Sequence, residues 1–292
     1  FLPGIRRLSA LLSGGKDPGA ISGKLREKDI TLAIALKLGK MVKSAYPDLN
    51  VVYTRTKDVA VDLRERGRIA NKAKAQLFIS IHVNKFSKSG VETYVLGLHK
   101  SEASFQVAMK ENEAIHYEED YSVKYDGFDP KKAESYIMFN FLKNSHLKNS
   151  MEFAAPIQKE LIARTRMPDR EVRQAGFIVL MDVGMPAVLI ETGFISNPSD
   201  QKILTSESGQ TNIARAIFTA FQTYKNNVER NSVVLTGYIE IVTDEAEKKA
   251  LWQDWFIEHF PGGVNDPTYC ILKFTAKRVT YWLDFQFVKG EV

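Results

Sequence analysis

The sequence predicts an α/β fold: a three-layer sandwich around a mostly parallel sheet, with a helical insertion, followed by a small α+β segment. Three observations predict it. Residues 77–84 form an apolar run typical of a strand buried on both faces. Shorter strand-like runs alternate with amphipathic helical patterns, as in sheets covered by helices. A polar, helical stretch over residues 98–170 interrupts this alternation.

The other elements follow from hydrophobic periodicity and from turn residues. Residues 1–13 show neither the helical nor the strand period and are expected to be weak strand or coil. The glycine-rich residues 14–19 are expected to form a loop. Helices are expected from Glu27 to the residue before Pro47 and over residues 64–75, 151–164 and 211–224, and strands over residues 51–54, 91–96, 175–181 and 187–190.

A change of composition divides the chain near residue 230. The polar run 225–231 is expected to be a linker, and all three tryptophans and the single cysteine lie beyond it. We therefore expect one domain over residues 1–230 and a separate segment over residues 231–292.

Composition excludes several classes of protein. Hydrophobic residues make up 44% of the chain and charged residues 26%, and no apolar run is long enough for an integral membrane segment. The single cysteine excludes an internal disulfide framework. A net charge of +5 favours an anionic partner, such as nucleic acid, acidic lipid or an acidic wall polymer. Because no basic run is interleaved with aromatic residues, nucleic acid is not expected.

Three residues next to turns are candidates for chemistry. His82 ends the buried strand, where open α/β sheets bind ligands. Glu27 follows a loop, and Glu191 follows the apolar run 187–190. Taken alone, the histidine is equally explained as a core residue, and each glutamate is better explained as a solvated charge or a helix N-terminal acid. Together they fit a zinc hydrolase, which needs His, Asp or Glu ligands, an open position for water and a further carboxylate for its proton.

Eight short motifs then occur in one order along residues 14–225. They are Gly14–Ala20, Leu25–Asp29, Thr54-Arg55 with Asp58, Leu63-Arg64 with Arg68–Asn71, Ser80–Asn84, Gly90–Tyr94, Gln174–Phe177 and Glu191–Asn197. In this order they resemble the catalytic domain of zinc-dependent N-acetylmuramoyl-L-alanine amidases of the type 3 family. Any one motif is weak, whereas eight in order are specific.

The resemblance implies a peptidoglycan hydrolase that cleaves the amide between N-acetylmuramic acid and L-alanine of the stem peptide by zinc-activated water. It implies that Glu27 and His82 are Zn²⁺ ligands and that Glu191 is the catalytic general base and acid. Asn84 and Arg55, which lie in matching motifs, are expected to contact the substrate. It also implies a periplasmic or extracellular location in the cell envelope.

The chain departs from the family at its first zinc ligand. The family has a histidine directly before the Gly-Gly pair, where this sequence has Ser13. Serine is a poor zinc ligand, so an alternative is a catalytically impaired amidase-like module that binds the wall or a regulator. Since the resemblance begins abruptly at Gly14, residues 1–13 are expected to be a non-native start.

The block 98–170 is too long for a simple connection and is expected to be a lid or regulatory insertion. One of its carboxylates is expected to occupy the open zinc position, as inserted helices do in some amidases that the chain resembles, and an activator protein is expected to act on the block. The alternative is a solvated acidic helix. The candidate acids are Glu111, Glu113, Glu118, Glu119 and Asp120.

The C-terminal segment resembles a different family. Its motifs are Leu235–Val242, Trp252–Phe256, Phe260–Gly263 and Tyr269–Phe274. They are similar to the C-terminal half of a pyridoxamine 5'-phosphate oxidase-like split barrel of the general stress protein kind. This allows a third alternative, a flavin-related stress protein. Because only half a barrel is present, flavin binding is not expected.

Overall fold

The computed structural model describes residues 7–11, 14–137, 139, 145–230, 232–283 and 286–291. The chain divides into two compact units, one over residues 4–225 and one over residues 226–292 together with residues 1–3. Each unit is described here by itself.

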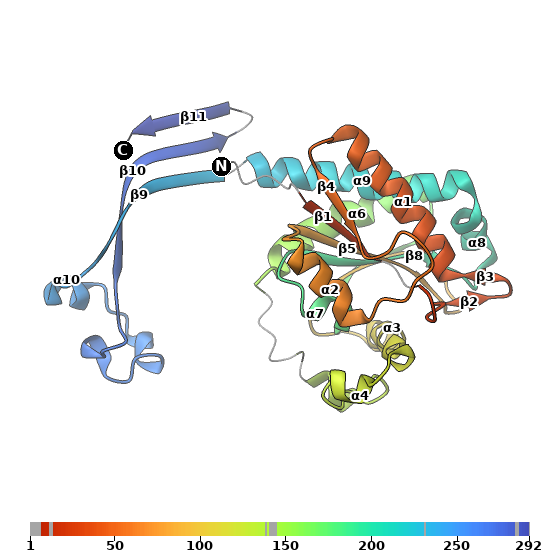
Figure 1. Ribbon diagram of the computed structural model, residues 1–292, viewed down its shortest axis with the longest axis horizontal. Helices are drawn as coiled ribbons and strands as arrows, with labels where there is room; N and C mark the ends of the chain where they lie inside the picture. The colour runs from red at the N-terminus through yellow and green to blue at the C-terminus, as the bar shows by residue number, and fades with distance from the viewer. Residues whose placement is uncertain are drawn as a thin grey trace. The chain divides into compact units, whose positions relative to one another are not determined.

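A six-stranded sheet forms the centre of the first unit (Figure 1). Every neighbouring pair of strands in it is parallel except β8 and β6, which confirms the mostly parallel sheet. In order across the sheet, the strands are β4 (Asn50–Tyr53), β1 (Arg7–Leu11), β5 (Leu77–Asn84), β8 (Ala187–Phe194), β6 (Val91–Leu96) and β7 (Asp169–Ala175).

Helices cover both faces of this sheet, so the three-layer architecture is also confirmed. One face packs on α1 (Glu27–Ala45), α6 (Leu147–Thr165) and α9 (Glu207–Arg230). The other packs on α2 (Leu63–Lys72), α7 (Ile178–Met181) and α3 (Glu102–Asn112). Strand β5 is buried along its whole length because its alternate side chains enter two different cores.

The alternation along β5 decides where its polar residues lie. Ile79 and Ile81 enter the core beneath α1 and α6, whereas Phe78 enters the core beneath α2 and α7. Successive side chains of a strand point to opposite faces. Ser80, His82 and Asn84 therefore share the face of Phe78, the face that α2, α7 and α3 cover.

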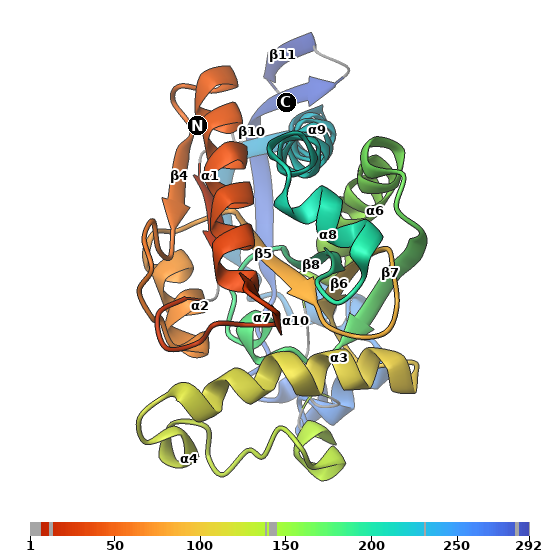
Figure 2. The ribbon, with the colours of Figure 1, turned by 90° about the vertical axis from the view of Figure 1, so that its right-hand side faces the viewer.

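The insertion follows β6 and contains α3, a 3₁₀ helix η1 (Glu113–Tyr117), α4 (Tyr121–Lys124) and a 3₁₀ helix η2 (Ala133–Ile137). Figure 2 shows α3 and α4 together at one end of the sheet-and-helix body. Helix α6 belongs to the main core, where Phe153, Ile157 and Leu161 are fully buried. The inserted part is therefore shorter than residues 98–170.

One predicted element was wrong. The strand predicted over residues 175–181 is the end of β7 followed by the helical turn α7, because a short apolar run fits a buried helix as well as a strand. The run 225–231, which was predicted to be a linker, lies where the chain divides into its two units, and it is helical as far as Arg230 because α9 continues. That run contains no glycine or proline to end the helix.

Residues 1–13 were expected to be weak strand or coil, and part of this stretch is β1, between β4 and β5, with Leu8 fully buried. Ser13 lies outside the described residues, and the non-native start stays a prediction. The remaining short elements of the first unit are β2 (Ile21–Ser22), β3 (Leu25–Arg26) and α8 (Pro198–Thr205).

The second unit is a small α+β segment. Its antiparallel sheet has the order β11 (Gln286–Glu291), β10 (Leu272–Leu283) and β9 (Ser232–Ile241). Between β9 and β10 lie α10 (Glu245–Ala250) and the 3₁₀ helices η3 (Asp254–Glu258) and η4 (Gly263–Asn265). No helix in the described parts of either unit is long and apolar enough to cross a membrane.

Candidate functional site

Glu27, the first residue of α1, is fixed where the glycine-rich loop meets the sheet. One carboxylate oxygen, Oε2, accepts a hydrogen bond from the Ala20 backbone N–H at 2.6 Å, and the other, Oε1, accepts one from the Val83 N–H at 3.2 Å. Gly19 makes this approach possible, because a Cβ there would lie 2.4 Å from Oε2 and its φ is +66°. The side chain is almost fully buried, and its two hydrogen bonds join the glycine-rich loop to the end of β5.

His82 joins two carboxylates. Its Nδ1 lies 2.9 Å from Glu27 Oε1 and 2.8 Å from Glu111 Oε2, and its Nε2 lies 2.9 Å from the hydroxyl of Ser80. Glu111 comes from α3 of the insertion. Within the described parts of the chain, Glu27, His82 and Glu111 form the group that could hold a metal ion, since their ligand atoms all lie within 4.8 Å of one another.

The charges of these groups stabilise one another. Burial lowers the pKa of His82, but the carboxylates of Glu111 and Glu27 outweigh burial and raise it to about 10. Burial raises the pKa of Glu111, but Lys110 and His82 outweigh it and lower the pKa to about 2. The Lys110 ammonium lies 3.1 Å from Glu111 Oε1. The structure therefore favours an ionised carboxylate at Glu111, the form that binds a cation.

Glu191 lies beside this cluster, opposite His82 on the neighbouring strand β8. It is fully buried, and neither carboxylate oxygen has a hydrogen-bond partner among the described residues. Burial, and then the negative charge of Glu111, raise the pKa of Glu191 well above its ordinary value. A buried carboxyl without partners is costly, so this group is available to bind water or a proton. Glu191 was predicted to lie at the end of its strand. Because β8 continues to Phe194, Glu191 instead lies inside the strand.

The two predicted substrate contacts have different surroundings. Asn84 is fully buried on β5, and its Nδ2 has no hydrogen-bond partner in the described structure. Arg55 donates to the backbone carbonyls of Lys28 at 2.6 Å and Lys57 at 3.1 Å. The Arg55 guanidinium thus ties the loop after β4 to α1, and its hydrogen bonds do not reach the Glu27–His82–Glu111 cluster.

The sequence did not identify which acid of the insertion would reach the site. Glu111 follows the buried Phe105 and Ala108 at a spacing of three residues, so it shares the packed face of α3. That spacing was a usable signal. Glu113 and Glu119 have side chains 44% and 89% exposed, so they face solvent.

Three further residues were missed by sequence reasoning. Lys110 pairs with Glu111, and the nearly buried side chains of Asp17 and Arg66 lie 3.6 Å apart. Burial raises the pKa of Asp17 although Arg66 opposes this, and the charges of Glu27 and Glu111 add to the effect. A lysine beside an acid on a charged helix, or an arginine on α2, gave no sequence signal of burial.

Comparison with known proteins finds related sequences for most of the chain. Residues 13–223 match the family described as N-acetylmuramoyl-L-alanine amidase. AmiC, an N-acetylmuramoyl-L-alanine amidase of Neisseria meningitidis serogroup B, is 31% identical over 224 residues, which cover 73% of this chain and 51% of that protein. The chain spans about half the length of the AmiC relatives that it matches.

Solved structures of similar fold include two from clostridia. The N-acetylmuramoyl-L-alanine amidase of Clostridium difficile 630 superimposes with a TM-score of 0.57 at 25% identity, covering 76% of this chain and 97% of that one. The CwlD amidase of Clostridioides difficile, solved in complex with the GerS lipoprotein, has a TM-score of 0.54 at 27% identity, covering 75% and 98%. Separately, residues 204–287 match the family described as pyridoxamine 5'-phosphate oxidase like.

Proposed function

This chain belongs to the N-acetylmuramoyl-L-alanine amidase family, and from that premise we propose that it hydrolyses the amide between N-acetylmuramic acid and L-alanine in peptidoglycan. The observation that carries the proposal is the cluster of Glu27, His82 and Glu111 with the unpartnered carboxyl of Glu191 beside it. A peptidoglycan substrate places the protein in the cell envelope, in the periplasm or outside the cell.

The donor set of the cluster suits zinc. One imidazole nitrogen and two carboxylates are ligands that Zn²⁺ takes, and all three side chains are buried or nearly so. Glu27 and His82 would hold the ion from the main fold, and Glu111 would hold it from the insertion. Zinc supplies Lewis acidity, which polarises a carbonyl group and lowers the pKa of water.

The chain's own residues supply positioning and proton transfer. The backbone N–H groups of Ala20 and Val83 hold the Glu27 carboxylate in one orientation. Glu191 has no competing hydrogen bond, so its carboxyl can accept a proton from the attacking water and return it to the leaving amine. The unpartnered Nδ2 of Asn84 is a donor suited to a substrate carbonyl, and we retain Asn84 as a substrate contact. The hydrogen bonds of Arg55 support a role in holding the loop after β4 against α1 better than a contact with the substrate.

The proposed activity is tested by incubating purified peptidoglycan with the protein and zinc, using both the unaltered chain and the Ser13→His variant. Amide cleavage frees the amino group of L-alanine without releasing reducing sugar ends. New L-alanine amino termini in digests of the Ser13→His variant are the expected result. Reducing ends without new L-alanine amino termini, or no product from either protein while zinc is bound, would refute the amidase proposal.

A second candidate function follows from Ser13 and is a wall-binding module with little catalysis. It predicts that the unaltered chain sediments with insoluble peptidoglycan but releases no product. The Ser13→His variant distinguishes the two functions, because a binding module gains no activity from a restored ligand.

The match of residues 204–287 supports a relation of the tail to flavin-binding barrels. A colourless purified protein would exclude the flavin-related alternative.

We further propose that Glu111 blocks the site until the insertion moves. A carboxylate bound at the metal position leaves no room there for substrate, and Glu111 lies 2.8 Å from His82 Nδ1. The insertion that carries Glu111 is the surface on which an activator protein would act. The complex of the similar CwlD amidase with a lipoprotein supports a protein partner of this kind.

Replacing Glu111 by glutamine in the Ser13→His background is expected to raise amidase activity about 5- to 150-fold, the usual range for a coupled site. The neutral amide is a poor zinc ligand and cannot form the ion pair with His82. The initial rate at which new L-alanine amino termini appear measures the change. Glu113→Gln is the matched control, since the Glu113 side chain is 44% exposed and forms a long ion pair of 3.7 Å with the exposed Lys131. An equal or lower rate in Glu111→Gln would contradict the blocking role.

A further inference from the structure

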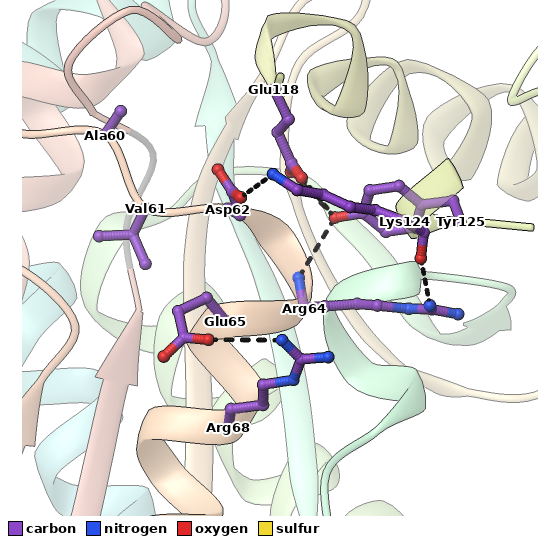
Figure 3. Close-up of a pocket in the computed structure, with 9 residues that line it drawn as sticks. All are labelled: Ala60, Val61, Asp62, Arg64, Glu65, Arg68, Glu118, Lys124 and Tyr125. Carbon is purple, nitrogen blue, oxygen red and sulfur yellow. Dashed lines mark hydrogen bonds and ion pairs between the residues drawn. The ribbon is translucent and has the colours of Figure 1, made fainter. Parts of the chain in front are cut away.

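The chain just beyond Glu111 is fastened to helix α2 by a second glutamate (Figure 3). Glu118 Oε1 accepts a hydrogen bond at 2.8 Å from the backbone N–H of Leu63, the first residue of α2. The hydroxyl of Tyr125 donates to the same carboxylate, at 2.9 and 2.8 Å from its two oxygens. Asp62, the N-cap residue of α2, makes no capping hydrogen bond with its own side chain. A residue of the insertion therefore satisfies an N–H group that helix starts leave free.

Further polar contacts surround this one. Lys124 Nζ lies 2.8 Å from Asp62 Oδ2, and the guanidinium of Arg64 lies 5.0 Å from the centre of the Tyr125 ring. Arg64 also donates to the backbone carbonyl of Lys124. Figure 3 shows these side chains converging from α2 and from α4. The contact thus joins residues that are far apart in the sequence.

Polar contacts supply much of what holds α4 on the main fold. The helix has no fully buried residue, because Val123 is 78% exposed and Tyr121 is only partly buried where it packs against the second core. Tyr125, which follows the helix, is buried in that core, so its hydroxyl contacts act beside an apolar contact. The contacts line an open pocket of about 380 Å³ between α2 and the insertion, bordered also by Val61 and Arg68. A junction of polar contacts around an open pocket separates more readily than a packed core.

A separate contact holds the end of α3. Asn112 follows Glu111 directly and is fully buried. Its Nδ2 donates to the Gly176 carbonyl at 2.8 Å, and its Oδ1 accepts from the Ile178 N–H at 2.9 Å. Asn112 and Glu118 are therefore polar tie points on the stretch that follows Glu111, and η1 lies between them with Ile115 buried in the second core.

We propose that Glu118 is a positioning residue, a latch that keeps Glu111 seated against His82. This inference rests on the proposed blocking role of Glu111 and names the contact that maintains it. When the Glu118 carboxylate leaves Leu63 and Tyr125, the end of η1 loses its hydrogen bonds to α2 and to Tyr125. Asn112 and the buried Ile115 then remain as the tie points of this stretch, so withdrawing Glu111 disrupts fewer contacts.

Hydrogen exchange of the whole chain, followed by mass spectrometry, tests the latch without requiring zinc or activity. In Glu118→Ala, the amides of α3 and η1 are expected to exchange about fivefold faster, the effect of losing one net hydrogen bond. Tyr125→Phe, which keeps the ring beside Arg64, is expected to act in the same direction. Adding it to Glu118→Ala is expected to give no further increase, because its hydroxyl acts through that carboxylate. Glu119→Ala is the matched control, since the Glu119 side chain is 89% exposed and its ion pair with Lys16 is long, at 3.8 Å.

Unchanged exchange of α3 in Glu118→Ala would overturn the latch. So would equal acceleration in β5 and β8, because that pattern reports a general loss of stability. The result also separates the latch from the blocking role. Faster exchange of α3 together with an unchanged amidase rate in Glu111→Gln would support the latch and refute the block.

Discussion

Replacing Glu191 by glutamine is expected to lower amidase activity about 10²- to 10⁴-fold, the range typical of a general acid or base. Glutamine has nearly the same shape as glutamate but cannot accept the proton of the attacking water. Because both oxygens of Glu191 lack hydrogen-bond partners in the described structure, the substitution removes no visible structural contact. The expected effect therefore falls on the reaction rate and not on folding.

The measurement is the rate at which Ser13→His produces new L-alanine amino termini with and without Glu191→Gln, with zinc content and thermal unfolding measured on the same samples. Zinc content and the unfolding temperature are expected to be unchanged or slightly raised, since a buried uncompensated acid is removed. Glu171→Gln is a suitable control, because that side chain is 78% exposed on β7. An undiminished rate in Glu191→Gln would show that Glu191 has only a structural role.

Replacing Ser13 by histidine is expected to tighten zinc binding at least about 10- to 100-fold, since even indirect support of a metal ligand is worth that much. Histidine adds a neutral nitrogen donor at the position that the family uses for its first ligand. Competition with a chromophoric chelator measures the dissociation constant of each protein. Equal zinc affinity in the two proteins would contradict this expectation.

The position of Glu111 sharpens that experiment. In the unaltered chain the Glu111 carboxylate lies close enough to Glu27 and His82 to serve as a third donor. The gain in zinc affinity from Ser13→His is therefore expected to be larger when Glu111 is replaced by glutamine. With Glu111 present, its carboxylate already supplies part of the coordination that the new histidine adds. If the two effects on zinc affinity are strictly additive, Glu111 does not share the ion with the other ligands.

The sequence was informative where local pattern and position coincide. The run Leu77–Asn84 could be recognised as a central strand because both of its faces are apolar, and its carboxyl end then located His82. Glu27 could be located because a glycine-rich loop precedes a helical pattern. These inferences depend only on periodicity and on turn residues.

Sequence reasoning failed where the answer depends on how elements pack. The short apolar run Ile178–Met181 fits a buried strand as well as a helical turn, and only its place against the second core decides between them. The spacing of Glu111 from Phe105 and Ala108 placed it on the packed face of α3, but that this face meets His82 depends on how α3 lies on the sheet. The contact of Glu118 with Leu63 joins segments of the insertion and the main fold, so it too could be found only in three dimensions.

Glu27, His82 and Glu111 are proposed to hold one zinc ion beside Glu191. The decisive test is a crystal of the unaltered chain grown with zinc and measured at the zinc absorption edge. An anomalous peak is expected about 2.0–2.2 Å from a carboxylate oxygen of Glu27, a ring nitrogen of His82 and a carboxylate oxygen of Glu111. Ordered side chains at these three positions with no peak between them, while zinc binds elsewhere on the protein, would contradict this proposal.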